Sequence, residues 1–165
     1  FSWHFDLDAI GLPGDAGFLE LNSTASYTQK YKVAGLLGSP TINYAGSAGF
    51  GGVGGGISHP KWKVNTGLTY GNDDFKATLL WRYVDRMVHS DKLANPASTS
   101  PGVPAYSYFD ANAEFDVDDR FTFGVGVTNL TDKTPPFISA APLTTDAATY
   151  DVIGRTFFAS VKAKF

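Results

Sequence analysis

The chain has 165 residues, with 18 glycines, 13 phenylalanines and no cysteine, and aromatic residues make up 15% of it. Charged residues account for 18% and the net charge is −3, so there is no basic field to hold nucleic-acid phosphates. The lack of cysteine excludes a disulfide framework, a thiolate zinc site and a cysteine nucleophile. No apolar run approaches the roughly 18 to 20 residues that a transmembrane helix needs.

Seven segments alternate apolar and polar residues with a period of two, which is typical of β-strands whose two faces meet different environments. The apolar faces contain, in chain order, Phe1, Trp3, Phe5 and Leu7; Leu19, Leu21, Ala25 and Tyr27; Trp62, Val64, Leu68 and Tyr70; Phe75, Ala77, Leu79, Trp81 and Tyr83; Phe109, Ala111, Ala113, Phe115 and Val117; Phe121, Phe123, Val125 and Val127; and Phe157, Ala159, Val161, Ala163 and Phe165. The pattern predicts an all-β antiparallel meander of seven strands, each paired with the next, without a helix longer than one or two turns.

Short and long connections alternate along the chain. The predicted turns at 11–17, 71–74 and 118–120 are short, whereas residues 31–60, 89–106 and 131–154 form long segments rich in Gly, Pro, Ser, Thr and Ala. Bacterial outer-membrane barrels have short turns at the periplasmic end and longer loops at the extracellular end. The spacing therefore favours a transmembrane β-barrel.

The composition of the two faces indicates which one meets lipid. Aromatic residues lie near both ends of the apolar faces, and about eight residues at about 3.3 Å each, tilted by about 45°, span roughly 20 Å of membrane. The opposite faces carry Lys, Asp, Glu, Asn and Thr at mid-strand, which suits a wet interior. A soluble antiparallel sheet with one solvated face also alternates and is the alternative interpretation.

Three segments of the C-terminal half resemble the end of TonB-dependent outer-membrane receptors. They are residues 103–110 (VPAYSYFD), 125–136 (VGVTNLTDKTPP) and 150–158 (YDVIGRTFF). Residues 44–46, 59–63 and 80–83 are also similar to this family, so that the resemblance covers about 44–165. The last strand resembles the assembly signal of outer-membrane barrels, which would consist here of Phe157, Ala159, Val161, Ala163 and Phe165.

The resemblance implies a barrel of about 22 strands, plugged by an N-terminal globular domain, in the bacterial outer membrane. Such a receptor imports a scarce, bulky nutrient, such as a ferric siderophore, cobalamin or an oligosaccharide, with energy passed on by TonB, ExbB and ExbD. The barrel assembly machinery and lipopolysaccharide are further implied partners. Because seven strands cannot close a barrel with an even strand count, we expect residues 1–165 to be the C-terminal part of a longer receptor. The plug domain, the TonB-contacting box and the preceding strands are absent from the sequence.

Aromatic and charged residues of the outer loops and rim are the candidates for binding the nutrient. They are Tyr44, Phe50, Arg86, His89, Tyr106, Phe137 and Tyr150. The alternative for each is loop packing or contact with lipopolysaccharide.

Other kinds of site find no support. The three histidines lack metal-ligand spacing, and the glycine-rich run at 51–56 lacks the Lys-Ser/Thr ending of a phosphate loop. Asp116 and the acidic pair at 118–119 lack the length and the closing Glu of a calcium loop. Ser90 and His89 are neighbours, which point to opposite faces of an extended strand. We therefore expect no enzyme activity, no metal site and no cofactor.

A second hypothesis is a small, self-contained structural or adhesive barrel. It needs an eighth strand, which only residues 41–50 offer, and the Gly and Pro residues around them weaken that proposal.

Overall fold

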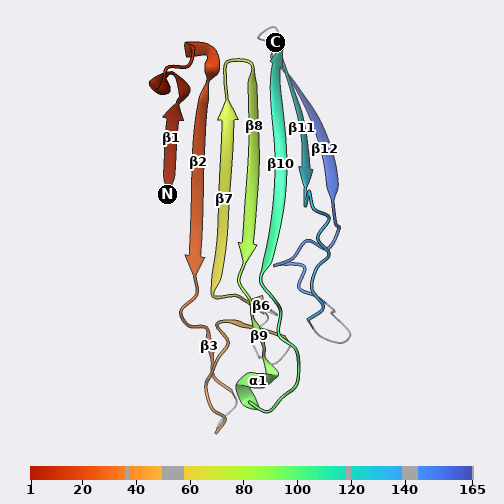
Figure 1. Ribbon diagram of the computed structural model, residues 1–165. Coiled ribbons are helices and arrows are strands. Elements are labelled where there is room, and N and C mark those ends of the chain that lie inside the picture. The colour runs from red at the N-terminus through yellow and green to blue at the C-terminus, as the bar shows by residue number, and fades with distance from the viewer. Residues whose placement is uncertain (36–37, 50–57, 118–119, 139–144, 165) are drawn as a thin grey trace.

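The computed structural model describes residues 1–35, 38–49, 58–117, 120–138 and 145–164. Its main element is one seven-stranded antiparallel sheet (Figure 1), in the order β1-β2-β7-β8-β10-β11-β12. The strands are β1 (Ser2–Asp6), β2 (Phe18–Tyr27), β7 (Trp62–Gly71), β8 (Phe75–Val84), β10 (Tyr106–Val117), β11 (Phe121–Thr128) and β12 (Thr156–Ala163). Each of the seven pairs with the next one along the chain, so the predicted meander is confirmed.

Small elements occupy the connections. Two 3-10 helices, Leu7–Ile10 and Gly14–Ala16, form the first turn. In the long segments β3 (Lys32–Val33) pairs with β4 (Ile42–Asn43), and β5 (Ser47–Ala48) lies between β6 (Ser58–His59) and β9 (Val88–His89). The helix α1 (Asp91–Ala94) has four residues. Among the described residues, no helix has the length and apolar character to cross a membrane.

Two details differ from the sequence prediction. Leu7 does not continue the first strand, because its N–H bonds to the Gly17 carbonyl at 2.9 Å and a 3-10 helix begins there. The described part of segment 41–50 contributes β4 and β5, which pair with other loop strands and not with the seven-stranded sheet. The second hypothesis therefore receives no eighth strand from these residues.

The register aligns the apolar residues of all seven strands. One continuous row of paired positions runs across the sheet through Trp3, Leu21, Leu68, Leu79, Ala111, Val127 and Phe157. Because the side-chain period is two, this row places every predicted apolar set within the strands on the same face. Several of these side chains are strongly exposed in the isolated chain, for example Phe157 (74%) and Val161 (63%). Such a continuous apolar surface favours contact with lipid over a solvated sheet.

The opposite face is polar and internally paired. Lys162 Nζ lies 3.3 Å from Glu114, and the hydroxyls of Thr69 and Thr78 lie 2.9 Å apart. Phe158 is an exception: its ring covers Gly126, where a β-carbon would collide with it. This face has the composition expected of a barrel interior.

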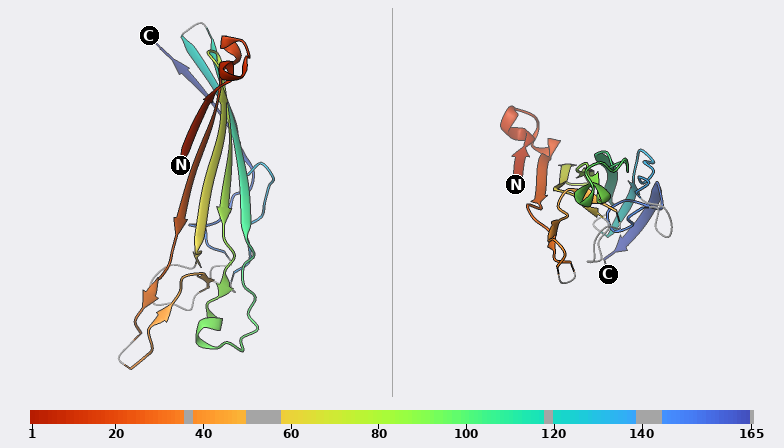
Figure 2. Two further views of the ribbon diagram at one scale, coloured as in Figure 1. Left: turned by 60° about the vertical axis from the view of Figure 1, so that its left-hand side comes forward. Right: turned by 90° about the horizontal axis from the view of Figure 1, so that it is seen from below.

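The two ends of the sheet differ. The short connections and the C-terminus lie at one end, called the turn end here, and the long segments lie at the other, the loop end (Figure 1). The sheet is curved, with β1 and β12 at its two sides (Figure 2). The buried hydrophobic cluster lies at the loop end and consists of Ala48, Val84, Met87, Val103, Tyr106, Tyr108, Ile138 and Tyr150. The packed part of the chain is therefore where the long segments fold against the strand ends.

Candidate functional site

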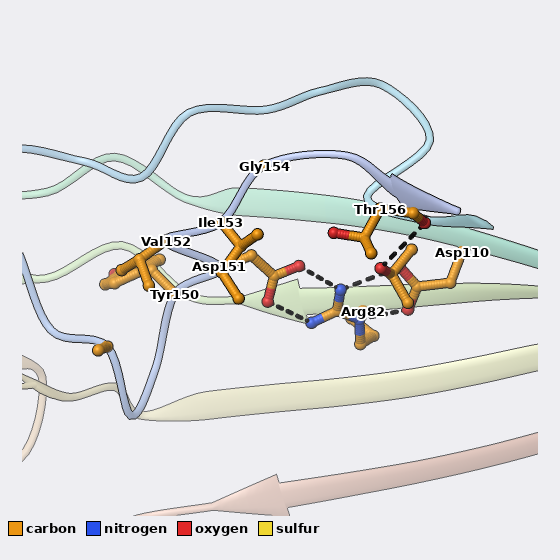
Figure 3. Close-up of a pocket in the computed structure, with 10 residues that line it drawn as sticks. Arg82, Asp110, Tyr150, Asp151, Val152, Ile153, Gly154 and Thr156 are labelled. Carbon is orange, nitrogen blue, oxygen red and sulfur yellow. Dashed lines mark hydrogen bonds and ion pairs between the residues drawn. The ribbon is translucent and has the colours of Figure 1, made fainter. Parts of the chain in front are cut away.

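An ion cluster at the loop end joins two strands to the last long segment. Nε and Nη2 of Arg82 in β8 donate to the two carboxylate oxygens of Asp110 in β10, at 2.6 and 3.0 Å. Nη1 and Nη2 donate to the two carboxylate oxygens of Asp151, at 3.0 and 2.5 Å. Figure 3 shows the guanidinium between the two carboxylates. We call these three residues the Arg82 clasp; its paired charge-assisted bonds fix both distance and orientation.

The strand pattern explains why Arg82 and Asp110 meet. Both belong to the polar face, where Arg82 is paired in register with Tyr108 and Asp110 with Leu80. Residues on diagonal positions of neighbouring strands are within reach of long side chains. The guanidinium also lies over the Tyr108 ring, 5.0 Å from its centroid. Asp151 reaches the clasp from the segment that leads into β12.

The segment NLTDK after β11 is a turn held by its own side chains. Asn129 is fully buried, and its backbone N–H donates to Asp110 Oδ1 at 2.8 Å. Its side-chain amide donates to the Lys133 carbonyl at 3.0 Å and accepts the Lys133 N–H at 2.8 Å. Asp132 accepts the N–H of Arg155 at 2.9 Å, immediately before β12. The turn thus connects β10, β11 and the start of β12 beside the clasp.

Asn129 also adopts a left-handed backbone conformation, with φ 52°. We expect Asn129→Ala to lower the free energy of unfolding by about 2 kcal/mol, because it removes both side-chain hydrogen bonds and strains the backbone. Asn129→Gly should recover about 1 kcal/mol of that loss, since glycine adopts this φ without strain. Urea titration of the full-length receptor in detergent measures both values. Equal losses for the two variants would show that the backbone conformation contributes nothing.

A cavity of about 400 Å³ adjoins the clasp. One part of its lining is polar, with Arg82, Asp110, Asp151, Thr128 and Thr156, and the other contains Ala147, Tyr150, Val152, Ile153 and Gly154. Ile153 is 86% exposed, two residues after Asp151, which accepts two hydrogen bonds from Arg82. Each of the four carboxylate oxygens of the clasp accepts a hydrogen bond from Arg82, so the cluster connects β8, β10 and the segment before β12.

Tyr150 anchors the same segment in the hydrophobic cluster. It is 2% exposed, and its ring meets that of Tyr106 edge-on with centroids 5.2 Å apart. Burial raises the pKa of Tyr150 above its ordinary value, with a smaller contribution from Tyr108. Tyr150 is therefore a neutral packing residue at physiological pH.

A second cavity, of about 640 Å³, lies among the loop strands. Its lining contains Lys61 and Arg86, the acid Asp85, four apolar residues (Met87, Val88, Val103 and Pro104) and two glycines (Gly46 and Gly102). Within the described part of the chain, the side chains of Lys61 and Arg86 form no ion pair or hydrogen bond. Asp85 accepts hydrogen bonds from the Tyr83 hydroxyl at 3.2 Å and from the Arg86 N–H at 2.8 Å.

The residues predicted to bind a nutrient lie in different places. Tyr106 and Tyr150 are buried together, Tyr44 is buried beside His59, and Arg86 lines the second cavity. His89 lies against Asp91, with Nδ1 3.3 Å from its carboxylate. Phe137 is 69% exposed, and Phe50 is outside the described residues. The ligand-binding role of all seven stays a prediction.

The clasp residues were not among the predicted site residues, although the alternation places Arg82 and Asp110 on the polar face.

For the predicted assembly signal, the structure gives only the position of the residues on the sheet. Phe157, Ala159 and Val161 lie on the apolar face with Ala163, and Phe165 is outside the described residues. The role of the predicted signal in assembly stays a prediction. Among the described residues there is no group of three side chains suited to hold a metal ion.

Known proteins share sequence features and the fold of this chain. Residues 4–130 match the family described as TonB dependent receptor-like, beta-barrel. A ferric enterobactin receptor from Pseudomonas aeruginosa, in complex with enterobactin, is 18% identical with a TM-score of 0.58, over 99% of this chain and 22% of that one. The siderophore receptor PirA from Acinetobacter baumannii is 19% identical with a TM-score of 0.53, over 92% of this chain and 20% of that one.

The copper transporter OprC is 20% identical with a TM-score of 0.52, over 93% of this chain and 22% of that one. The chain therefore spans about a fifth of the length of these solved structures, which it resembles in fold. No curated protein matches it significantly in sequence.

Proposed function

Since the chain belongs to the TonB-dependent receptor family, we propose that it forms part of the wall of an outer-membrane transporter for a scarce, bulky nutrient. The observation that carries the proposal is the unbroken row of apolar residues across all seven strands, with a polar face behind it. That arrangement suits a barrel wall between lipid and a wet interior. The family is one of receptors and transporters, and we expect no enzyme activity of the whole receptor.

The seven strands are part of a larger barrel in this proposal. In lipid an unpaired strand edge leaves backbone N–H and C=O groups without partners, at a cost of several kcal/mol each. Further strands of the same receptor would therefore pair with β1 and β12, and a plug domain would fill the interior. Energy for transport would come from TonB, ExbB and ExbD through the N-terminal region. The barrel assembly machinery would insert the receptor by means of the last strand.

The loop end faces the outside of the cell in this proposal, beside lipopolysaccharide, and the turn end faces the periplasm. Arg86 and Phe137 have exposed side chains and are the predicted residues most accessible to a nutrient. Tyr44, Tyr106 and Tyr150 are buried and would support the loops that contact it. Phe50 and His89 remain further candidates. Siderophores and copper, which the names of the similar structures mention, and cobalamin and oligosaccharides are the substrates to compare.

Uptake in cells tests the proposal. The full-length receptor is expressed in a strain that lacks its own copy, and accumulation of labelled ferric siderophores, copper, cyanocobalamin and oligosaccharides is measured with and without functional TonB. We expect at least one substrate to accumulate only when both the receptor and TonB are present. Accumulation of every substrate to the same level without TonB would contradict the proposed function.

A further inference from the structure

The apolar face of the sheet contains a hollow of about 330 Å³ over β10 and β11. Its lining consists of Ala111, Ala113, Val125, Val127 and Phe157 from the apolar face, together with Asn112 and Gly126. Phe157 borders the hollow on the side of β12 and is 74% exposed. We call this cavity the outer hollow. A protruding aromatic ring therefore lies directly beside a depression formed by small and β-branched residues.

The ring and the outer hollow lie at the same height along the strands. Phe157 pairs with Val127, and Val127 pairs with Ala111, so these residues form one row across β12, β11 and β10. Two copies related by a two-fold axis along the membrane normal bring residues of equal depth together, and each copy contributes the same patch. With the axis near β11, Phe157 of each copy would enter the outer hollow of the other.

Charges at the loop-end rim are complementary in the same arrangement. Arg155 lies directly before β12, on the side of the ring, and Asp132 follows β11, on the side of the outer hollow. Within one chain their side chains are partly exposed and approach each other only to 4.0 Å. The neighbouring Lys133 lies over the Tyr106 ring, with Nζ 5.2 Å from its centroid. The same two-fold axis would bring Arg155 of each copy toward Asp132 of the other.

A lipid acyl chain is the alternative occupant of the outer hollow. Fixing an acyl chain in one shape costs the freedom of many torsions, whereas a Phe ring has two side-chain torsions and is carried by a strand. Between transmembrane helices, close packing at small residues drives association in lipid, and the same physical reason holds for this wall. An acyl chain also offers no counterpart to Arg155 and Asp132. The observations therefore favour a second copy of the chain.

We propose that Phe157 and the outer hollow form the interface of a two-fold dimer of the receptor in the outer membrane. The inference rests on the proposed function, because it requires the apolar face to lie in lipid. Both loop ends of the dimer face the same side of the membrane. The dimer is held by two rings in two hollows and by two ion pairs at the rim.

Cross-linking of the full-length receptor in outer membranes locates the axis. Any native cysteine is first replaced by serine. Val125→Cys, on β11 and 51% exposed, should be joined to its equivalent in a second copy by a short bifunctional methanethiosulfonate. Ala25→Cys is the matched control, since Ala25 belongs to the apolar face of β2 and does not line the outer hollow. We expect a band of twice the mass for Val125→Cys and none for Ala25→Cys.

Filling the outer hollow should weaken the dimer. We expect Ala111→Trp to raise the dissociation constant of the purified receptor about tenfold in analytical ultracentrifugation, because its side chain occupies the space of the incoming ring. Ala25→Trp adds the same side chain outside the outer hollow and should change the constant less than about twofold. Heat-modifiable migration checks the folding of each variant.

Charge variants separate contacts between copies from contacts within one chain. Arg155→Asp and Asp132→Arg each break the pair within the chain and place like charges together in their own dimers. When the two variants are mixed, both rim contacts of the mixed dimer regain opposite charges. With different affinity tags on the two variants, we expect the mixed dimer to exceed its statistical share about threefold. A pair that acts only within one chain would leave the statistical distribution unchanged.

Several results would overturn the inference. They are a receptor that stays monomeric at its density in outer membranes, equal cross-linking of Val125→Cys and Ala25→Cys, an unchanged dissociation constant for Ala111→Trp, and a statistical mixture of the charge variants. A monomer that retains a bound lipid, and loses it in Ala111→Trp, would assign the outer hollow to an acyl chain and overturn the dimer. A monomer with TonB-dependent uptake would overturn the inference and still support the proposed function. Lack of any TonB-dependent uptake would contradict the proposed function itself.

Discussion

Replacing Arg82 with methionine is expected to release residues 146–155 from the sheet. Asp151 loses both of its bonds to the guanidinium, while Asp110 keeps the Asn129 N–H as a donor. Two carboxylates then face each other without a cation. Breaking a buried pair costs about 3–5 kcal/mol, and the partial exposure of these three side chains reduces the expected loss to about 2–3 kcal/mol. Hydrogen exchange of the backbone amides at 146–155, together with urea titration, measures both effects.

A charge rearrangement distinguishes the loss of the Arg82 clasp from a general loss of stability. Arg82→Asp combined with Asp151→Arg retains one cation between two carboxylates, so it should restore part of the exchange protection that Arg82→Met removes. Arg82→Asp alone should be the most severe variant, because it places three acids together. Unchanged protection of residues 146–155 in Arg82→Met would show that Tyr150 packing alone holds this segment.

Arginine substitutions at two adjacent positions should change the stability of the receptor to very different extents. Leu79 lies mid-strand in the apolar row and Leu80 lies on the polar face, paired with Asp110. We expect Leu79→Arg to destabilise the membrane-inserted receptor by about 2–4 kcal/mol, the cost of a basic side chain on the lipid face near the bilayer centre. Leu80→Arg should change stability by less than about 1 kcal/mol, since its charge enters a wet interior beside an acid.

The amount of heat-modifiable receptor in outer membranes and its unfolding in lipid vesicles measure this difference. The residue introduced is the same in both variants, so the comparison depends only on the face. Equal loss in both variants would contradict the assignment of the apolar face to lipid.

Alternation was sufficient to predict the seven strands, because each face meets one environment along most of the strand. Leu7 shows the limit of this reasoning: it continues the alternation, but a hydrogen bond to Gly17 starts a 3-10 helix. The strands within the long segments have only two residues each, too few for a period of two to be recognised. Their pairing depends on contacts that local sequence does not specify.

The Arg82 clasp was not predictable for a related reason. Arg82 and Asp151 are 69 residues apart, and the long segment between β8 and β10 hides the register that brings Arg82 to Asp110. A partial signal did exist, since an arginine on the polar face near a strand end needs acidic partners when it is covered. The motifs NLTDK and YDVIGR suggested a family, and the structure shows that the first forms a turn and that the second supplies Asp151 to the clasp.

Cysteine labelling on intact cells tests the central claim most directly, namely that the sheet crosses the outer membrane with its loop end outside. The chain contains no cysteine, and any cysteine in the rest of the receptor is first replaced by serine, so that single substitutions have no background. In the full-length receptor, we expect Phe137→Cys to react with a membrane-impermeant maleimide on intact cells. Asp73→Cys, between β7 and β8, should react only after the outer membrane is permeabilised. Labelling of Asp73→Cys on intact cells, with protection of Phe137→Cys, would contradict the account.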